Sequence, residues 1–249
     1  MNEISAKQIL LRKDTLACLL LALIFVIFPQ IDLIVSNWFY DTVEQNFYLA
    51  EHWLVDGIYQ LFAKPQVVLL PLLILFSIFC YLRYRKRCHS KRHKKYVCAF
   101  LLASLIVGPG LIVNEVLKNN SVGRARPVHI EQYGGDAQFT PAFVYSGYCQ
   151  TNCSFVSGHA AVGFYFIGLA WLFRRKNAFY LGLAIGILVS FTRIAKGGHF
   201  LSDTVFAFWV VYFTNVILAY WFRLENPLVE NEATVNQPHV EDKLNPKPY

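Results

Sequence analysis

Three polar stretches interrupt an otherwise apolar chain, and each holds side chains suited to acid–base or anion chemistry. They are KNNSVGRARP (118–127), SFVSGHA (154–160) and TRIAKGGHFLSD (192–203), and each lies at the end of an apolar run. Charged groups and histidines are costly to place at a bilayer edge, so by default they indicate a functional site. The three stretches are therefore the first place to look for the chemistry of this chain.

His199 and Asp203 are four residues apart where we expect a helix to begin, a spacing that places both on one helix face. A carboxylate bonded to one imidazole nitrogen fixes the tautomer and leaves the other nitrogen free and more basic. This arrangement suits a nucleophilic histidine. The alternative is a pair that only caps a helix, and a metal site is less favoured because no acidic ligand set accompanies the pair.

His159 follows Ser157 and Gly158 at an expected junction of loop and helix. A helix N-terminus offers unpaired amide donors and the positive end of the helix dipole, and both favour phosphate. Gly158 allows close approach of the backbone to an anion, and a protonated His159 can donate to a leaving oxygen. The alternative is a plain serine N-cap followed by a buried histidine.

Basic side chains near these groups match the charge of a phosphoryl group. Arginine binds phosphate oxygens in pairs, and cations stabilise the charge that spreads over the equatorial oxygens during phosphoryl transfer. The candidates are Lys118, Arg124, Arg126 and Arg193. Snorkelling toward lipid headgroups explains any one of them alone, and also Lys196. Their combination with two histidines and a paired carboxylate favours phosphoryl-transfer chemistry.

The elements that position these groups are expected to be membrane helices. The chain has 249 residues, 55% hydrophobic and 16% charged, whereas soluble domains carry about a quarter charged residues. A span needs about 20 apolar residues. We therefore predict an all-α membrane protein, a bundle of six transmembrane helices at Thr15–Val35, Gln66–Tyr84, Tyr96–Leu117, Val156–Phe173, Ala178–Ile194 and Leu201–Phe222.

The positive charge predicts how these helices are oriented. The net charge is +7, but eight of the 23 Lys and Arg residues lie in the short loop 83–95, which favours a topology signal over nucleic-acid binding. Two further basic clusters, before the first span and at 174–176, fall on the same side. We therefore expect both termini in the cytoplasm and the three polar stretches on the opposite face of the membrane. Residues 1–224 form the expected membrane domain, and 225–249 a disordered cytoplasmic tail.

Two features of the expected periplasmic loops are also informative. The aromatic-rich first loop predicts an interfacial belt, and part of Leu49–Ala63 is expected to form an amphipathic helix that lies on the membrane. Cys149 and Cys153 are four residues apart. In an oxidising periplasm we expect a small disulfide loop rather than two free thiols. A metal site is disfavoured, since no second Cys/His pair at ligand spacing accompanies them.

The three stretches resemble the signatures of the type-2 phosphatidic acid phosphatase family, which also includes vanadium haloperoxidases. The family pattern is Lys, six residues, Arg-Pro; then Pro-Ser-Gly-His; then Ser-Arg, five residues, His, three residues, Asp. Arg126–Pro127, Ser157–Gly158–His159, and Arg193 with His199 and Asp203 fit it. Three departures stand out: seven residues separate Lys118 from Arg126, and Val156 and Thr192 replace the usual proline and serine.

The resemblance implies a metal-free, two-step phosphatase without cofactors. His199 would attack phosphorus and form a phosphohistidine, and Asp203 would orient it. His159 would protonate the departing alkoxide and then activate water. The phosphate would be held by Lys118, Arg126, Ser157, Gly158 and Arg193. Because of the extra residue in the first signature, either a loop absorbs the insertion or Arg124 shares the role of Lys118.

The runs GPGLIVNEVLKNN, GRARPVHIEQYGGD, CQTNCSFVSGHA and GGHFLSD resemble those of bacterial lipid A 4′-phosphatases in this family. The resemblance implies a lipid substrate in the periplasmic leaflet, with lipid A favoured. Lipid A 1-phosphatase, undecaprenyl diphosphate phosphatase and phosphatidylglycerol phosphate phosphatase stay open as alternatives. A transporter is less favoured because its ionisable residues would lie near the bilayer midplane. A haloperoxidase is disfavoured because this chain is expected to lie in a membrane.

Overall fold

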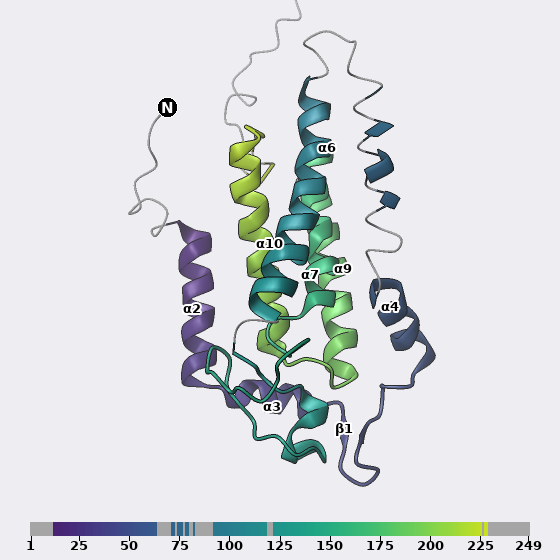
Figure 1. Ribbon diagram of the computed structural model, residues 1–249, viewed down its shortest axis with the longest axis vertical. Coiled ribbons are helices and arrows are strands. Elements are labelled where there is room, and N and C mark those ends of the chain that lie inside the picture. Colours follow the sequence, from purple (N-terminus) through teal and green to yellow (C-terminus); the bar gives the residue numbers. More distant parts are fainter. Residues whose placement is uncertain are drawn as a thin grey trace, which may run out of the picture.

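The computed structural model describes residues 12–63, 71–72, 74–76, 78–79, 82, 92–118, 122–225 and 227–228. Within these ranges the protein is mainly helical (Figure 1). Most of the second predicted span, Gln66–Tyr84, lies outside the described residues, as does nearly all of the predicted tail. The described residues of that span are helical.

Among the residues that the structure describes, three helices are long and apolar enough to cross a membrane: Tyr96–Lys118, Lys176–Ala195 and Leu201–Trp221. The first comprises α6 (Arg92–Leu105) from Tyr96 onward and the π-helical η2 (Ile106–Lys118), and the others are α9 (Lys176–Ala195) and α10 (Leu201–Trp221). They agree with three of the six predicted spans. Figure 1 shows α6, α9 and α10 running side by side, with the loops that carry the polar stretches gathered at the lower end.

The predicted span Val156–Phe173 is a shorter apolar helix, Gly158–Phe173. It consists of α7 (Gly158–Tyr165), the 3-10 turn η5 (Phe166–Gly168) and α8 (Leu169–Phe173). Glycines let this helix pack directly on α9. A Cβ at Gly182 would lie 2.3 Å from the backbone nitrogen of Ile167, and one at Gly186 2.0 Å from the ring of Phe164. Such close approach of helices is typical of small residues at membrane-helix interfaces.

The first predicted span is not one continuous helix. The structure forms α2 (Lys13–Ile27) and α3 (Gln30–Asn37), which meet at an angle of 82°. The physical reason is Pro29, which has no N–H to donate and disfavours helical backbone at Phe28. The structure therefore corrects the expectation at Thr15–Val35. Counted as one bent span, the pair brings the candidate spans among the described residues to four.

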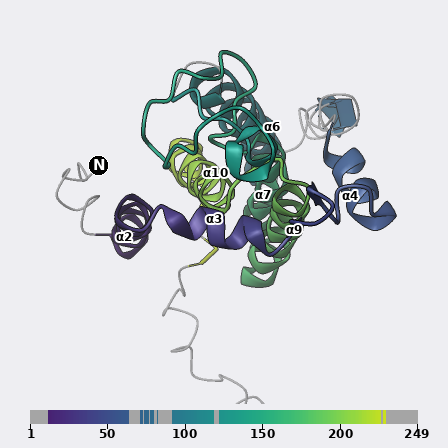
Figure 2. The same cartoon turned by 90° about the horizontal axis from the view of Figure 1, so that it is seen from below.

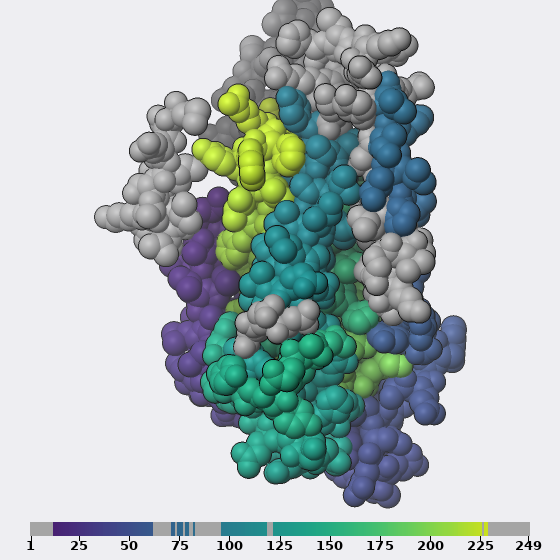
Figure 3. All heavy atoms as spheres, viewed as in Figure 1, coloured from purple at the N-terminus to yellow at the C-terminus, as the bar shows by residue number. Residues whose placement is uncertain are grey.

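After the bend the chain builds the lower end of the molecule. A two-stranded hairpin pairs β1 (Tyr40–Asp41) with β2 (Asn46–Phe47), and α4 (Trp53–Ala63) follows where an amphipathic helix was predicted. Instead of standing apart, α4 contacts α9 and α7. The long loop 122–157, with the short turns η3 (Pro127–His129) and η4 (Glu131–Tyr133), forms a teal layer over this end (Figure 3).

Two apolar cores hold this arrangement together. The larger lies between the long helices and contains buried residues such as Phe100, Phe164 and Val211. The smaller lies under the loops and joins Phe47 of β2, Ile130 of the long loop and Phe200 before α10. Because Phe200 directly follows His199, the smaller core fixes the backbone at one of the predicted site residues.

Candidate active site

The three polar stretches meet at the lower end of the helices. Lys118 ends η2, Gly158 begins α7, and the short turn between α9 and α10 carries His199. Figure 2 views this end and shows α3 crossing beside the ends of α9 and α10, in agreement with the contacts between these helices. Segments far apart in sequence therefore converge as the sequence predicts.

His199 faces Asp203 within the buried interior. The distance from His199 Nδ1 to Asp203 Oδ2 is 3.5 Å, and both side chains are 0% exposed. Asp203 Oδ2 also accepts a hydrogen bond of 2.8 Å from the backbone N–H of Phe200, which caps α10. The aspartate thus serves as helix cap and as histidine partner at once, so the two alternatives posed by the sequence are compatible.

The environment of His199 favours its neutral form. Burial holds the pKa of this imidazole well below its usual value, and the positive charges of Arg193, Arg126 and Lys118 lower the pKa further. Neither ring nitrogen has a hydrogen-bond partner within the described ranges. A neutral imidazole keeps a lone pair, which a nucleophile needs.

The N-terminus of α7 forms a second part of the site. Ser157 is the N-cap, and its hydroxyl oxygen accepts from the N–H of Ala160 at 3.4 Å. A Cβ at Gly158 would lie 2.7 Å from Asn114 Oδ1 and 3.6 Å from Lys118 Nζ. A side chain at this position would have to displace Asn114 Oδ1, and the Lys118 ammonium lies beside the helix N-terminus. Both features suit an anion at this point.

His159, in the first turn of α7, is half-buried. Its Nδ1 is buried and makes no hydrogen bond to any residue that the structure describes. The Tyr59 ring lies beside the imidazole. A histidine at a helix N-terminus with an unused nitrogen is able to exchange a proton with a bound group.

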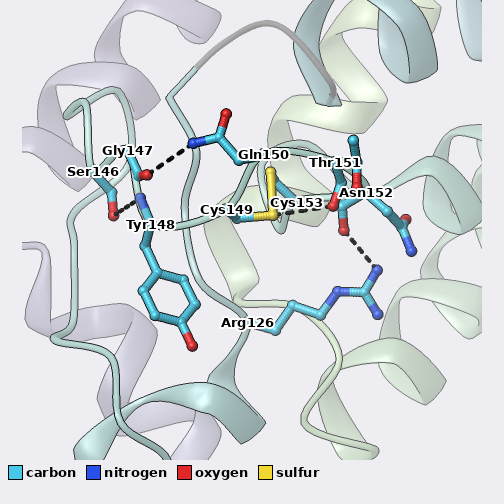
Figure 4. The surroundings of a disulfide bond; sticks show 9 residues. All are labelled: Arg126, Ser146, Gly147, Tyr148, Cys149, Gln150, Thr151, Asn152 and Cys153. Atoms are coloured by element: carbon cyan, nitrogen blue, oxygen red, sulfur yellow. Dashed lines mark hydrogen bonds between the residues drawn. A yellow bond between two sulfur atoms is a disulfide. The ribbon is translucent and has the colours of Figure 1, made fainter.

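Three cations share a common feature: Lys118, Arg126 and Arg193 form no ion pair with any described acidic side chain. The Arg193 guanidinium packs against Gly198, where a Cβ would lie 2.3 Å from Nη2. Arg126 Nη2 donates to the backbone oxygen of Asn152 at 2.9 Å (Figure 4). Lys118 and Arg193 are buried and Arg126 is partly buried, and cations in such positions without counter-ions are suited to an anionic ligand.

Arg124 differs from these three cations. Its Nη1 lies 2.7 Å from Asp203 Oδ1, and its Nη2 lies 2.8 Å from Asp32 Oδ2. All three side chains are buried. The guanidinium therefore already has two carboxylate partners, which favours Lys118 over Arg124 for the first phosphate contact. Residues 119–121, which include part of the seven-residue spacing, lie outside the described residues.

Tyr59 of α4 was not singled out as a site residue by the sequence. Its ring centroid is 5.2 Å from that of His159, and the Arg193 guanidinium carbon lies 4.7 Å from the same ring. Lys196 Nζ donates to Asp56 Oδ1 at 3.0 Å and to the backbone oxygen of Ala50. Lys196 thus has protein partners in α4 and just before it, which the expectation of snorkelling did not include.

Asp32 is a second residue that sequence reasoning missed. It lies within the predicted first span, where an isolated aspartate in an apolar run is itself a sign of function. Ser154 and Ser202 were also overlooked, because serine carries little information in a sequence without a known position. The structure brings all three to Asp203 or to Arg124.

Cys149 and Cys153 are joined by a disulfide in the structure (Figure 4). The loop that they close contains Asn152, the partner of Arg126. Within the described ranges, no three histidine, cysteine or acidic residues are grouped so that they could hold a metal ion.

Comparison with known proteins assigns the family. The model of the PAP2 superfamily matches residues 96–227, which contain all three polar stretches. A lipid A 4′-phosphatase of Francisella tularensis subsp. novicida (strain U112) is 35% identical over 218 residues, 83% of this chain and 93% of that protein. One from Rhizobium leguminosarum is 38% identical over 149 residues, 58% of this chain and 61% of that protein.

A lipid A 1-phosphatase of Rhizobium etli (strain ATCC 51251 / DSM 11541 / JCM 21823 / NBRC 15573 / CFN 42) is more distant, at 31% identity over 161 residues, 61% of this chain and 65% of that protein. No solved structure matches the chain significantly. The family match covers more than half of the chain, and the Francisella protein aligns over most of both lengths. The chain therefore belongs to the PAP2 superfamily, as a membrane phosphatase related to lipid A 4′-phosphatases.

Proposed function

We propose that this protein is an inner-membrane phosphatase that removes a phosphate monoester from lipid A, most favourably at the 4′-position. The observation that carries the proposal is the buried imidazole of His199, which lies beside Asp203. Burial and three nearby cations lower the pKa of His199. A nucleophile and a set of cations are the two requirements of phosphoryl transfer through a covalent intermediate.

In the first step, Nε2 of His199 attacks phosphorus and forms an N–P bond. Asp203, at Nδ1, holds the ring and stabilises the positive charge that develops on it. The P–O bond to the sugar breaks, and His159 gives its proton to the departing alkoxide. In the second step, His159 takes a proton from water, the water oxygen attacks phosphorus, and the P–N bond breaks to release inorganic phosphate.

The charge on the equatorial oxygens requires donors that are in place before the reaction. Ser157 and Gly158 contribute the N-terminus of α7. The cations proposed to hold the phosphate are Lys118, Arg126 and Arg193. Arginine suits the role because its planar fork matches two phosphate oxygens. Arg124 is not among the proposed phosphate ligands.

The proposed topology follows the positive-inside rule. We propose six spans with both termini in the cytoplasm and the site at the periplasmic face, with residues 1–224 as the membrane domain and residues 225–249, most of which lie outside the described residues, as a cytoplasmic tail. Single cysteines introduced at Asn152 and at Arg174 test the orientation in intact cells. A membrane-impermeant maleimide should label the first and spare the second, and the opposite pattern would contradict the proposal.

His199→Ala tests the nucleophile. Purified His199→Ala should release no phosphate from lipid A, whereas His129→Ala, which removes an exposed histidine of η3, should keep full activity. Acid-labile phosphate should appear on the wild-type protein during turnover and be absent from His199→Ala. Full activity of folded His199→Ala would remove His199 from the mechanism.

Mass spectrometry of the lipid product tests the substrate. Loss of the 4′-phosphate supports the favoured position, in line with the 35–39% identity to lipid A 4′-phosphatases. Loss of the 1-phosphate supports the alternative, since lipid A 1-phosphatases are 31–33% identical. Activity confined to undecaprenyl diphosphate or phosphatidylglycerol phosphate would keep the chemistry and replace the substrate.

A further inference from the structure

Two carboxylates and one guanidinium form a buried ionic cluster beneath the proposed site. Asp32 of α3, Arg124 of the long loop and Asp203 of α10 are 1%, 0% and 0% exposed, respectively. Desolvation of three charged groups is costly unless each is well bonded. Only Asp203 belongs to the family signatures, so the other two residues require an explanation.

Arg124 is held on every side. Its Nη1 donates to Asp203 Oδ1 at 2.7 Å and to Ser202 Oγ at 2.8 Å, and its Nη2 donates to Asp32 Oδ2 at 2.8 Å. Its Nε donates to the backbone oxygen of Thr140 at 2.7 Å. The Phe200 ring lies against the guanidinium at 4.1 Å. With all three nitrogens bonded, this planar group has one fixed orientation.

The two oxygens of Asp203 have separate partners. Oδ1 accepts from Arg124, whereas Oδ2 accepts from Ser154 Oγ and from the N–H of Phe200, and also faces His199 Nδ1. Rotation of the carboxylate would break bonds at both oxygens. Arg124 at Oδ1, together with Ser154 and the Phe200 N–H at Oδ2, therefore holds Oδ2 toward His199.

Asp32 holds the opposite side of Arg124 and also the start of α10. Its Oδ1 accepts from the N–H of Ser202 at 2.8 Å, and its Oδ2 accepts from Ser202 Oγ at 2.6 Å. Ser202 directly precedes Asp203. Asp32 therefore fixes both the guanidinium that binds Asp203 and the backbone that carries it.

We infer that Arg124, fixed by Asp32, is a positioning residue that orients Asp203 toward His199 and does not bind the substrate phosphate. This inference rests on the proposed role of His199 as nucleophile. The same chemistry occurs around metal-bound histidines, where an outer partner that orients a ligand contributes on the order of 10–100-fold in activity. We expect a loss of this size on removal of Arg124.

Arg124→Lys and Arg126→Lys form a matched pair for the test, because one arginine has carboxylate partners and the other has none among the described residues. Each purified variant is assayed on lipid A for kcat and KM, and its affinity for orthovanadate is measured by thermal shift. Arg124→Lys should lower kcat about 10-fold or more and leave KM and vanadate affinity nearly unchanged. Arg126→Lys should weaken vanadate binding and raise KM.

A double-mutant cycle separates positioning from a general structural effect. In an Asp203→Asn background, Arg124→Lys should cause no further loss of kcat, because its effect passes through Asp203. Losses that multiply would contradict the inference. Weakened vanadate binding by Arg124→Lys, equal to that of Arg126→Lys, would identify Arg124 as a phosphate ligand and also contradict it. If the double variant is too slow to assay, vanadate affinity decides alone.

Asp32→Asn provides the same test should Arg124→Lys fail to fold, since it retains the size of the side chain and removes the charge. It should lower kcat with unchanged vanadate affinity. The two proposals fail in different ways. Full activity of His199→Ala would overturn the proposed function, whereas inactive His199→Ala together with fully active Arg124→Lys and Asp32→Asn would overturn only the positioning role.

Discussion

The ring of Tyr59 on α4 lies 5.2 Å from the imidazole of His159 on α7, measured between ring centroids. The same tyrosine ring lies over the guanidinium of Arg193, at 4.7 Å. A helix whose sequence predicts a membrane-surface anchor thus contributes a side chain to the proposed phosphate site. The contact makes α4 part of the proposed site.

Tyr59→Leu should raise KM for lipid A, because the ring holds the Arg193 guanidinium through a cation–π contact that contributes about 0.5–2 kcal/mol. This corresponds to a roughly 2- to 30-fold change in binding. Tyr59→Phe should behave as the wild type, since the ring is kept. Tyr180→Leu, which removes an exposed tyrosine of α9, is the control. Equal KM values for Tyr59→Leu and Tyr180→Leu would show that the ring has no role.

The Lys196–Asp56 ion pair should hold α4 in place. Lys196→Ala should weaken the docking of α4 only slightly, because the carboxylate is nearly half exposed and such pairs contribute about 0–1 kcal/mol. Hydrogen exchange of the α4 amides measures the effect. Relative to the wild type, Lys196→Ala should speed exchange in α4 more than in α10. Uniformly unchanged exchange would assign the docking to apolar contacts alone.

The acidic limb of kcat/KM should report His199. Burial and the nearby cations lower the pKa of His199, so the imidazole stays neutral at pH values below the usual histidine pKa of about 6.5. Activity should therefore persist as the pH falls through 6.5 and decline only at lower pH. A decline centred at or above pH 6.5 in wild-type kcat/KM would contradict the lowered pKa.

Reduction of the Cys149–Cys153 disulfide should act on substrate binding. The loop that it closes carries the Asn152 carbonyl bonded to Arg126 (Figure 4). Closing so short a loop lowers the entropy of the unfolded chain and so stabilises the folded state by about 2 kcal/mol. Cys149→Ser should raise KM more than it lowers kcat. Cys18→Ser, at a free cysteine, should change neither. A kcat effect without a KM effect would place the disulfide outside the phosphate site.

Local sequence was sufficient to predict the groups that lie next to each other at helix ends. Asp203 lies in the first turn of α10 and His199 in the turn directly before that helix, so their closeness in sequence keeps the two side chains near each other, and Ser157 and Gly158 are neighbours at the start of α7. The predicted helices at Tyr96–Leu117, Ala178–Ile194 and Leu201–Phe222 needed only their apolar length. The sequence also predicts that the polar stretches meet at one end of these helices, because they and the basic clusters lie in alternate loops.

Contacts between segments far apart in the sequence could not be predicted from it. Arg124 carries the same charge as Arg126 two residues away, and only the fold shows that one meets two carboxylates while the other meets none in the described chain. Tyr59 was one of many aromatic residues in its loop, and its role depends on how α4 docks. The proline itself indicates a bend at Pro29, but the sequence does not indicate against which helices α3 packs.

Asp32 follows the bend at Pro29 and contacts Arg124, so the proposed site needs residues outside the family match. The family match covers residues 96–227 and contains every signature residue, yet Asp32 and Tyr59 lie upstream of it. A fragment restricted to the matched residues would retain both histidines and Asp203, but its Arg124 would lose one of its two carboxylate partners and its Arg193 the aromatic ring beside it. Two residues from the N-terminal part of the chain, Asp32 and Tyr59, thus contact the proposed site, which extends beyond the signatures.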